Sequence, residues 1–169
     1  MRRIFLLCVL LGLPGLARAQ AESPYNPRVA GVLVRCVSSS GLPVAFVPNT
    51  LLADVGLGFP DWPDVPAHVE YNPGMLARLP PPVQLFWFGH TCAHEVLKAP
   101  SSEQDADCWA LEFLKRQGLV SRPQVVEIQA YLEGKPVVRW GHQPGPERAR
   151  SLLGCYDRKP GARKQGRGD

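Results

Sequence analysis

Two histidines four residues apart, His90 and His94, are well placed to share a metal ion. They lie in an apolar stretch, residues 83–97, which is predicted to be a buried helix because apolar side chains cover most of its surface. Four residues are about one helical turn, so both imidazoles project from the same face and can hold one ion. Taken alone, the pair is equally consistent with two core histidines bonded to backbone carbonyls.

A pair of carboxylates follows on the next predicted helix. Glu103 and Asp107 are also four residues apart, so they share a face. A glutamate from a neighbouring antiparallel helix is a good third zinc ligand, and three protein ligands leave a position open for water. Asp107 can accept a hydrogen bond from a ligand imidazole and fix its tautomer. The alternative is an ordinary acidic helix start, but we favour a Zn²⁺ site formed by His90, His94 and Glu103.

The spacing of these residues resembles that of the gluzincin metallopeptidases. Residues 90–94 read HTCAH and residues 103–107 read EQDAD, similar to the family's H-E-x-x-H and E-x-x-A-D strings. The short gap resembles the compact minigluzincins and also uncharacterised secreted bacterial proteins that read GHECAH and ADCWA. The resemblance extends from about residue 71 to Cys155. It implies a zincin-like fold, the same zinc ligands, and a peptide or protein as substrate or partner.

Two further roles follow only from this resemblance. In such proteins a strand just before the active-site helix forms the substrate-binding edge, a role that would fall to residues His68–Tyr71. Residues 140–148 read WGHQPGPER and resemble an H-P-x-x-x-x-R stretch found after the third ligand. By that resemblance, His142 approaches the metal and stabilises an oxyanion.

Thr91 occupies the position of the family's catalytic glutamate, which takes a proton from the metal-bound water. A threonine hydroxyl is un-ionised at neutral pH and cannot act as that base. Because a general base typically contributes about 10²–10⁴-fold to the rate, proteolysis is expected to suffer severely even with zinc bound. Glu95 and His142 are the two alternative bases, but the helical period turns Glu95 mostly beside the metal.

The N-terminus has the features of a secretory signal peptide. Two arginines precede the short apolar run 4–13, and residues 17–19 form an A-x-A cleavage pattern. We expect cleavage after Ala19, with Ala21 as second choice, and export to the periplasm or beyond the cell. The apolar run is too short for a membrane span, which needs about 20 residues.

Cleavage would change the charge of the chain. The formal charge of +4 includes three arginines of the signal, so 16 basic and 15 acidic residues would remain, a net +1. Five of those basic residues lie in the last twelve positions of the tail 157–169, which is predicted to be disordered. The body, residues 20–156, is expected to be one domain, and no basic face indicates nucleic-acid binding.

Four cysteines would remain after cleavage, and an even number in an oxidising compartment suggests two disulfides. Three pairings are open. We favour Cys92–Cys108 with Cys36–Cys155, because the first pair would join neighbouring helices. Zinc binding by cysteine is disfavoured, because no C-x-x-C spacing is present.

The predicted fold class is α+β. Strands are expected at residues 31–37, 43–47 and 68–71 in a small, mostly antiparallel sheet, with a loop at residues 55–66. One or two helical turns at 75–79 precede the helix that carries His90. Three further helices are expected at 102–117, 121–132 and 145–155.

Three functions therefore remain open: an exported zinc peptidase, a non-catalytic metal-binding or partner-binding relative of one, and a disulfide-stapled envelope protein without metal. The sequence names neither a substrate nor an oligomeric state.

Overall fold

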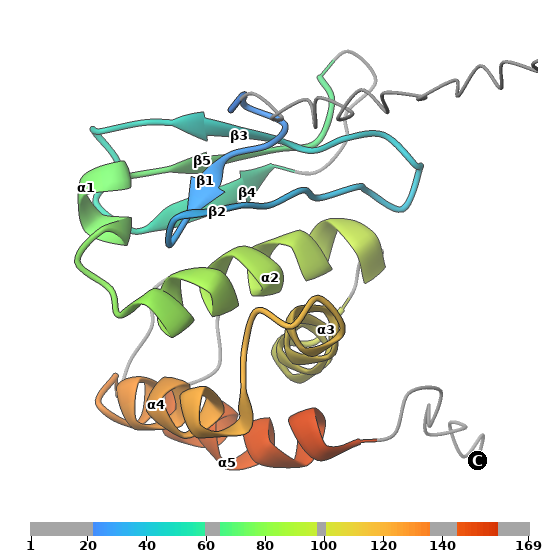
Figure 1. Cartoon of the computed structure of the whole chain (residues 1–169). Coiled ribbons are helices and arrows are strands. Elements are labelled where there is room, and N and C mark those ends of the chain that lie inside the picture. Colours follow the sequence, from blue (N-terminus) through green and yellow to red (C-terminus); the bar gives the residue numbers. More distant parts are fainter. Residues whose placement is uncertain (1–21, 60–64, 98–100, 136–144, 159–169) are drawn as a thin grey trace, which may run out of the picture.

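The computed structural model describes residues 22–59, 65–97, 101–135 and 145–158. Within these ranges short strands come first and helices follow, so the α+β prediction is confirmed (Figure 1). The strands are β1 (Arg28–Val29), β2 (Val32–Leu33), β3 (Ala45–Pro48), β4 (Gly56–Phe59) and β5 (His68–Tyr71). The helices are α1 (Pro73–Leu76), α2 (Pro81–Leu97), α3 (Glu103–Arg116), α4 (Arg122–Glu133) and α5 (Gly145–Asp157).

The sheet lies on one side of α2, and α4 and α5 lie on its other side (Figure 1). The sheet order is β3-β5-β4, with β5 parallel to β3 and antiparallel to β4. A separate antiparallel pair joins β1 and β2. Two of the three described strand pairs are therefore antiparallel, as expected for a mostly antiparallel arrangement.

The central place of β5 contradicts one prediction. All four of its residues, His68–Tyr71, pair with β3 on one side and with β4 on the other. The backbone N–H and C=O groups of β5 are thus bonded within the sheet on both sides. The strand therefore cannot be the exposed edge strand expected from the gluzincin resemblance. Among the described strands of this sheet, β3 and β4 are the outer ones.

The predicted loop at residues 55–66 is wrong for its first part, because residues Gly56–Phe59 form β4. Strand β4 contains two glycines and no β-branched residue, so its sequence gives little indication of a strand. Gly56 is required by packing: a Cβ atom there would overlap the Trp87 ring of α2 and lie 2.9 Å from the Glu70 carbonyl oxygen. The missing side chain lets α2 approach the sheet closely.

Helix α2 is the centre of the core. Its buried apolar residues pack between the sheet and the other helices, and they are Val83, Leu85, Phe86, Phe88, Cys92 and Ala93. On the side of α3, a Cβ atom at Gly89 would lie 3.1 Å from the Cβ of Ala110. Two small residues thus bring α2 and α3 close together, which matters because each helix carries part of the site.

The predicted helices are confirmed to within a few residues. The Ser102 side chain caps α3 by accepting a hydrogen bond from the Asp105 backbone N–H. Gly118, at a φ of 67°, ends the turn after α3 in the left-handed region. Ser121 and Gln124 form a capping box at the start of α4. Helix α5 runs to Asp157, two residues past its predicted end.

Two disulfides are present, but the favoured pairing is wrong. Cys36 bonds to Cys92 of α2, and Cys108 of α3 bonds to Cys155 of α5. The helical period explains the error: Cys92 lies two residues, about 200°, from His90, which faces α3. Cys92 therefore points away from α3 and reaches the segment before β3 instead.

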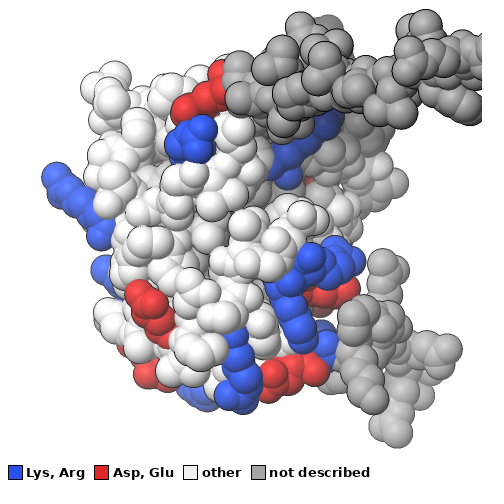
Figure 2. Space-filling view, in the orientation of Figure 1, with Lys and Arg blue, Asp and Glu red and all other residues white. Residues whose placement is uncertain are grey.

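Three predicted features lie outside the described residues: the signal peptide at 1–19, His142, and the tail from residue 159. Among the described residues, no helix is both long and apolar enough to cross a membrane. Acidic and basic side chains lie close to one another on the face shown in Figure 2, and its described residues form no continuous basic surface.

Replacing Cys108 and Cys155 together by serine removes a bond that spans 47 residues of sequence. Because this crosslink restricts the unfolded chain, we expect the free energy of unfolding to fall by about 2–5 kcal/mol, measured by urea denaturation. Peptide mapping of the unreduced wild-type protein is the control. A digest containing a Cys92–Cys108 peptide pair would contradict the connectivity described above.

Candidate metal centre

The two histidines of α2 converge on one point. The Nε2 atoms of His90 and His94 lie 3.2 Å apart, as their spacing of one helical turn predicts. The His90 side chain is 8% exposed and that of His94 is 29% exposed. The His90 side chain is therefore nearly buried, and the His94 side chain is the more exposed of the two.

Glu103 reaches the same point from α3, of which it is the first residue. Its Oε2 atom lies 3.4 Å from His90 Nε2, and its Oε1 atom lies 3.4 Å from His94 Nε2. One ligand atom from each of the three residues lies within 4.8 Å of the other two. The sequence prediction that these three side chains come together is confirmed.

These separations are compatible with one ion shared by the three side chains. Ligand atoms placed tetrahedrally at about 2.0–2.1 Å from zinc lie about 3.3–3.4 Å from one another. The two Nε2 atoms lie 3.2 Å apart, and each lies 3.4 Å from a different oxygen of Glu103, His90 from Oε2 and His94 from Oε1. A shift of the Glu103 carboxylate that brings one oxygen toward both imidazoles would let the three side chains hold one ion with one position left open.

The far side of each imidazole is also held. His90 Nδ1 lies 2.7 Å from the Asp107 carboxylate, and His94 Nδ1 lies 3.1 Å from the Ser101 hydroxyl. An ionised carboxylate only accepts hydrogen bonds, so His90 donates through Nδ1–H and its Nε2 lone pair faces the cluster. Asp107 thus occupies the orienting position that the sequence predicts.

The ionisation of this pair suits metal binding. Burial, together with the charge of Arg148, lowers the pKa of His90 despite the opposing effect of Asp107. Burial alone would raise the pKa of Asp107, but hydrogen bonds from His90 and Arg148 outweigh it and hold that pKa below its ordinary value. At neutral pH the pair is a neutral imidazole beside an ionised carboxylate, the state that a metal ligand and its orienting acceptor require.

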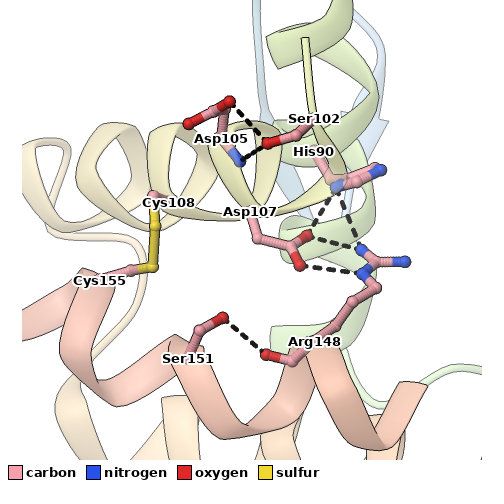
Figure 3. Close-up of a disulfide and its surroundings, with 8 residues drawn as sticks. All are labelled: His90, Ser102, Asp105, Asp107, Cys108, Arg148, Ser151 and Cys155. Atoms are coloured by element: carbon pink, nitrogen blue, oxygen red, sulfur yellow. Dashed lines mark hydrogen bonds and ion pairs between the residues drawn. A yellow bond between two sulfur atoms is a disulfide. The ribbon is translucent and has the colours of Figure 1, made fainter. Parts of the chain in front are cut away.

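Arg148 is the residue that sequence reasoning missed. It lies on α5, and its Nε and Nη2 atoms donate to the two oxygens of Asp107 at 2.9 and 2.6 Å (Figure 3). It is 8% exposed, and its Nη1 lies 3.5 Å from Glu103 Oε2. The available signal was the final arginine of residues 140–148, which read WGHQPGPER.

Thr91 cannot replace the carboxylate that serves as catalytic base at this position in gluzincins. Its hydroxyl donates to the backbone carbonyl of Trp87, one turn earlier in α2, at 2.9 Å. Glu95, the alternative base on this helix, has its Oε1 atom beside β4, 3.3 Å from the place where a Cβ atom of Gly58 would be. The cluster of potential ligands found among the described residues does not include Glu95.

Comparison with known proteins adds no assignment. A scan against protein-family models, a search of curated proteins and a search of solved structures each gave no match. The functional argument therefore depends on the geometry of His90, His94, Glu103 and their neighbours.

Proposed function

We propose that this chain is an exported protein that binds one Zn²⁺ ion through His90, His94 and Glu103 on a gluzincin-like scaffold, and that it does not hydrolyse peptides efficiently. The observation that carries the proposal is the convergence of one ligand atom from each of the three residues within 4.8 Å of one another. Asp107 adds support because it orients His90.

The ligand chemistry favours zinc among common divalent ions. Two imidazole nitrogens and one carboxylate are a usual zinc set, whereas Ca²⁺ and Mg²⁺ prefer oxygen ligands throughout. Bound zinc would supply Lewis acidity and one open position. The chain itself would hold the ligands through His90, His94 and Glu103.

Thr91 on α2 is the reason why efficient peptide hydrolysis is not expected. The mechanism needs a group that accepts a proton from water and passes it to the leaving amine. The Thr91 hydroxyl is committed as a donor to the Trp87 carbonyl, and a hydroxyl is not basic at neutral pH. Loss of this group would leave a metal site without its base, which favours a metal-binding or partner-binding relative of a peptidase over an active enzyme.

Export is supported by the two disulfides. Such bonds persist in the periplasm and outside the cell, whereas cytosolic thiols are kept reduced. This agrees with the signal peptide expected at residues 1–19.

Metal analysis tests the zinc site. Purified mature protein, incubated with Zn²⁺ and desalted, should contain about one zinc per chain by plasma mass spectrometry, as expected for a single site. His90→Ala should contain almost none, because one ligand of three is lost. His68→Ala is the matched control, since this histidine lies on β5 and stacks on Phe59, and it should retain the metal. Absence of zinc from the wild-type protein would contradict the proposal and indicate that the three side chains have only a structural role.

A second experiment addresses catalysis. We expect zinc-loaded Thr91→Glu to hydrolyse fluorescently labelled casein at least about 10²-fold faster than the parent, because a general base contributes about 10²–10⁴-fold. Thr91→Gln, of nearly the same size but without a carboxylate, should stay as slow as the parent. Zinc-dependent hydrolysis of casein by the unchanged protein, at a rate that Thr91→Glu does not increase, would contradict the loss of catalysis.

A further inference from the structure

The guanidinium of Arg148 touches both carboxylates of the site. Through Nε and Nη2 it grips Asp107 in a two-bond fork, and through Nη1 it lies 3.5 Å from Oε2 of Glu103. Nη2 also lies 3.1 Å from Nδ1 of His90. In Figure 3 the arginine reaches from α5 across Asp107 toward His90. The guanidinium therefore contacts both carboxylates. Because Nδ1–H of His90 donates to Asp107, its approach to Nη2 brings two donors together and is not a hydrogen bond.

The charges of this cluster need such a partner. Asp107 is fully buried, and the Glu103 side chain is 13% exposed. Two carboxylates in a poorly hydrated place repel each other and lose hydration, which is costly unless a cation is paired with them. Arg148 and Asp107 together are neutral. The fork therefore orients His90 without adding a net negative charge to the site.

We propose that Arg148 is a positioning residue of the metal site, whose fork on Asp107 and contact with Glu103 hold His90 and Glu103 in ligating geometry before the metal binds. The proposal rests on the proposed function, because it assumes that the three-residue cluster binds zinc. It assigns to α5 a part in the site beyond the two helices that carry the ligands.

The architecture keeps the arginine in place. Helix α5 is joined to α3 by the Cys108–Cys155 disulfide, and Cys108 follows Asp107 directly in the chain. Arg148 lies about two helical turns before Cys155 on the same helix. The Cys108–Cys155 disulfide and the Arg148–Asp107 ion pair thus both connect α3 to α5. The disulfide limits how far Arg148 can move from Asp107.

Charge and orientation have opposite effects on zinc, and this decides which variant is informative. A nearby cation repels Zn²⁺, so removing the charge of Arg148 would strengthen binding, whereas losing the fork would weaken it. Arg148→Lys separates the two effects. Lysine keeps the positive charge but is a point donor, and it cannot bind both oxygens of Asp107 in parallel while reaching Glu103.

Zinc affinity, measured by competition with a chromogenic chelator, is expected to fall about 10–100-fold in Arg148→Lys, the range found when a partner of a metal ligand is lost. The absorption spectrum of Co²⁺ in the site should also change, which a purely structural role would not require. Arg150→Lys is the matched control. Arg150 is exposed on the same helix and donates to the Pro146 carbonyl, so its variant should match wild type in both measurements.

A double variant, Asp107→Asn with Arg148→Met, covers the case in which Arg148→Lys does not fold, since it leaves neither charge buried alone. Weaker zinc binding by about the same factor is expected, because the two residues act as one unit. Wild-type affinity and an unchanged Co²⁺ spectrum in either folded variant would overturn the role of Arg148. Absence of zinc binding in wild type would instead overturn the proposed function.

Discussion

The buried carboxylate of Asp107 is the constraint on which the site depends. Without exposure to water, this charge must be paired and hydrogen-bonded, and its two partners come from different helices: His90 from α2 and Arg148 from α5. Three helices must therefore meet around one carboxylate. The close contact of Gly89 with Ala110 lets α2 and α3 approach, and the Cys108–Cys155 bond joins α3 to α5.

Different faces of helix α2 carry side chains with different roles. His90 and His94 point toward α3, Cys92 points toward Cys36, and Trp87 packs against Gly56 of β4. Thr91 follows Trp87 by one turn and is bonded to its carbonyl, so it lies on the sheet side of the ligands. In this arrangement the face of α2 that carries His90 and His94 is separate from the face that carries Trp87 and Thr91. A change at Thr91 can remove a base without moving either imidazole.

The pairing of His90 with His94, and of Glu103 with Asp107, was predictable from a local rule: residues four apart on a helix share a face. The meeting of the two pairs was expected because the helices follow each other in the chain and because the spacing resembles that of gluzincins. The same rule, applied to Cys92 relative to His90, would have excluded a Cys92–Cys108 bond. Arg148 was harder to find, because it meets Asp107 across 41 residues of sequence. Strand β4 and the central place of β5 depend on how segments pair in space, and a glycine-containing strand shows little local signal.

X-ray absorption at the zinc edge tests the central claim most directly, because it reports which atoms surround the ion. The account predicts only nitrogen and oxygen neighbours at about 2.0–2.1 Å, with the multiple-scattering pattern of two imidazoles. All four described cysteines are paired in disulfides, so sulfur should be absent from the shell. A sulfur neighbour at about 2.3 Å, or a shell without imidazole, would contradict a site formed by His90, His94 and Glu103.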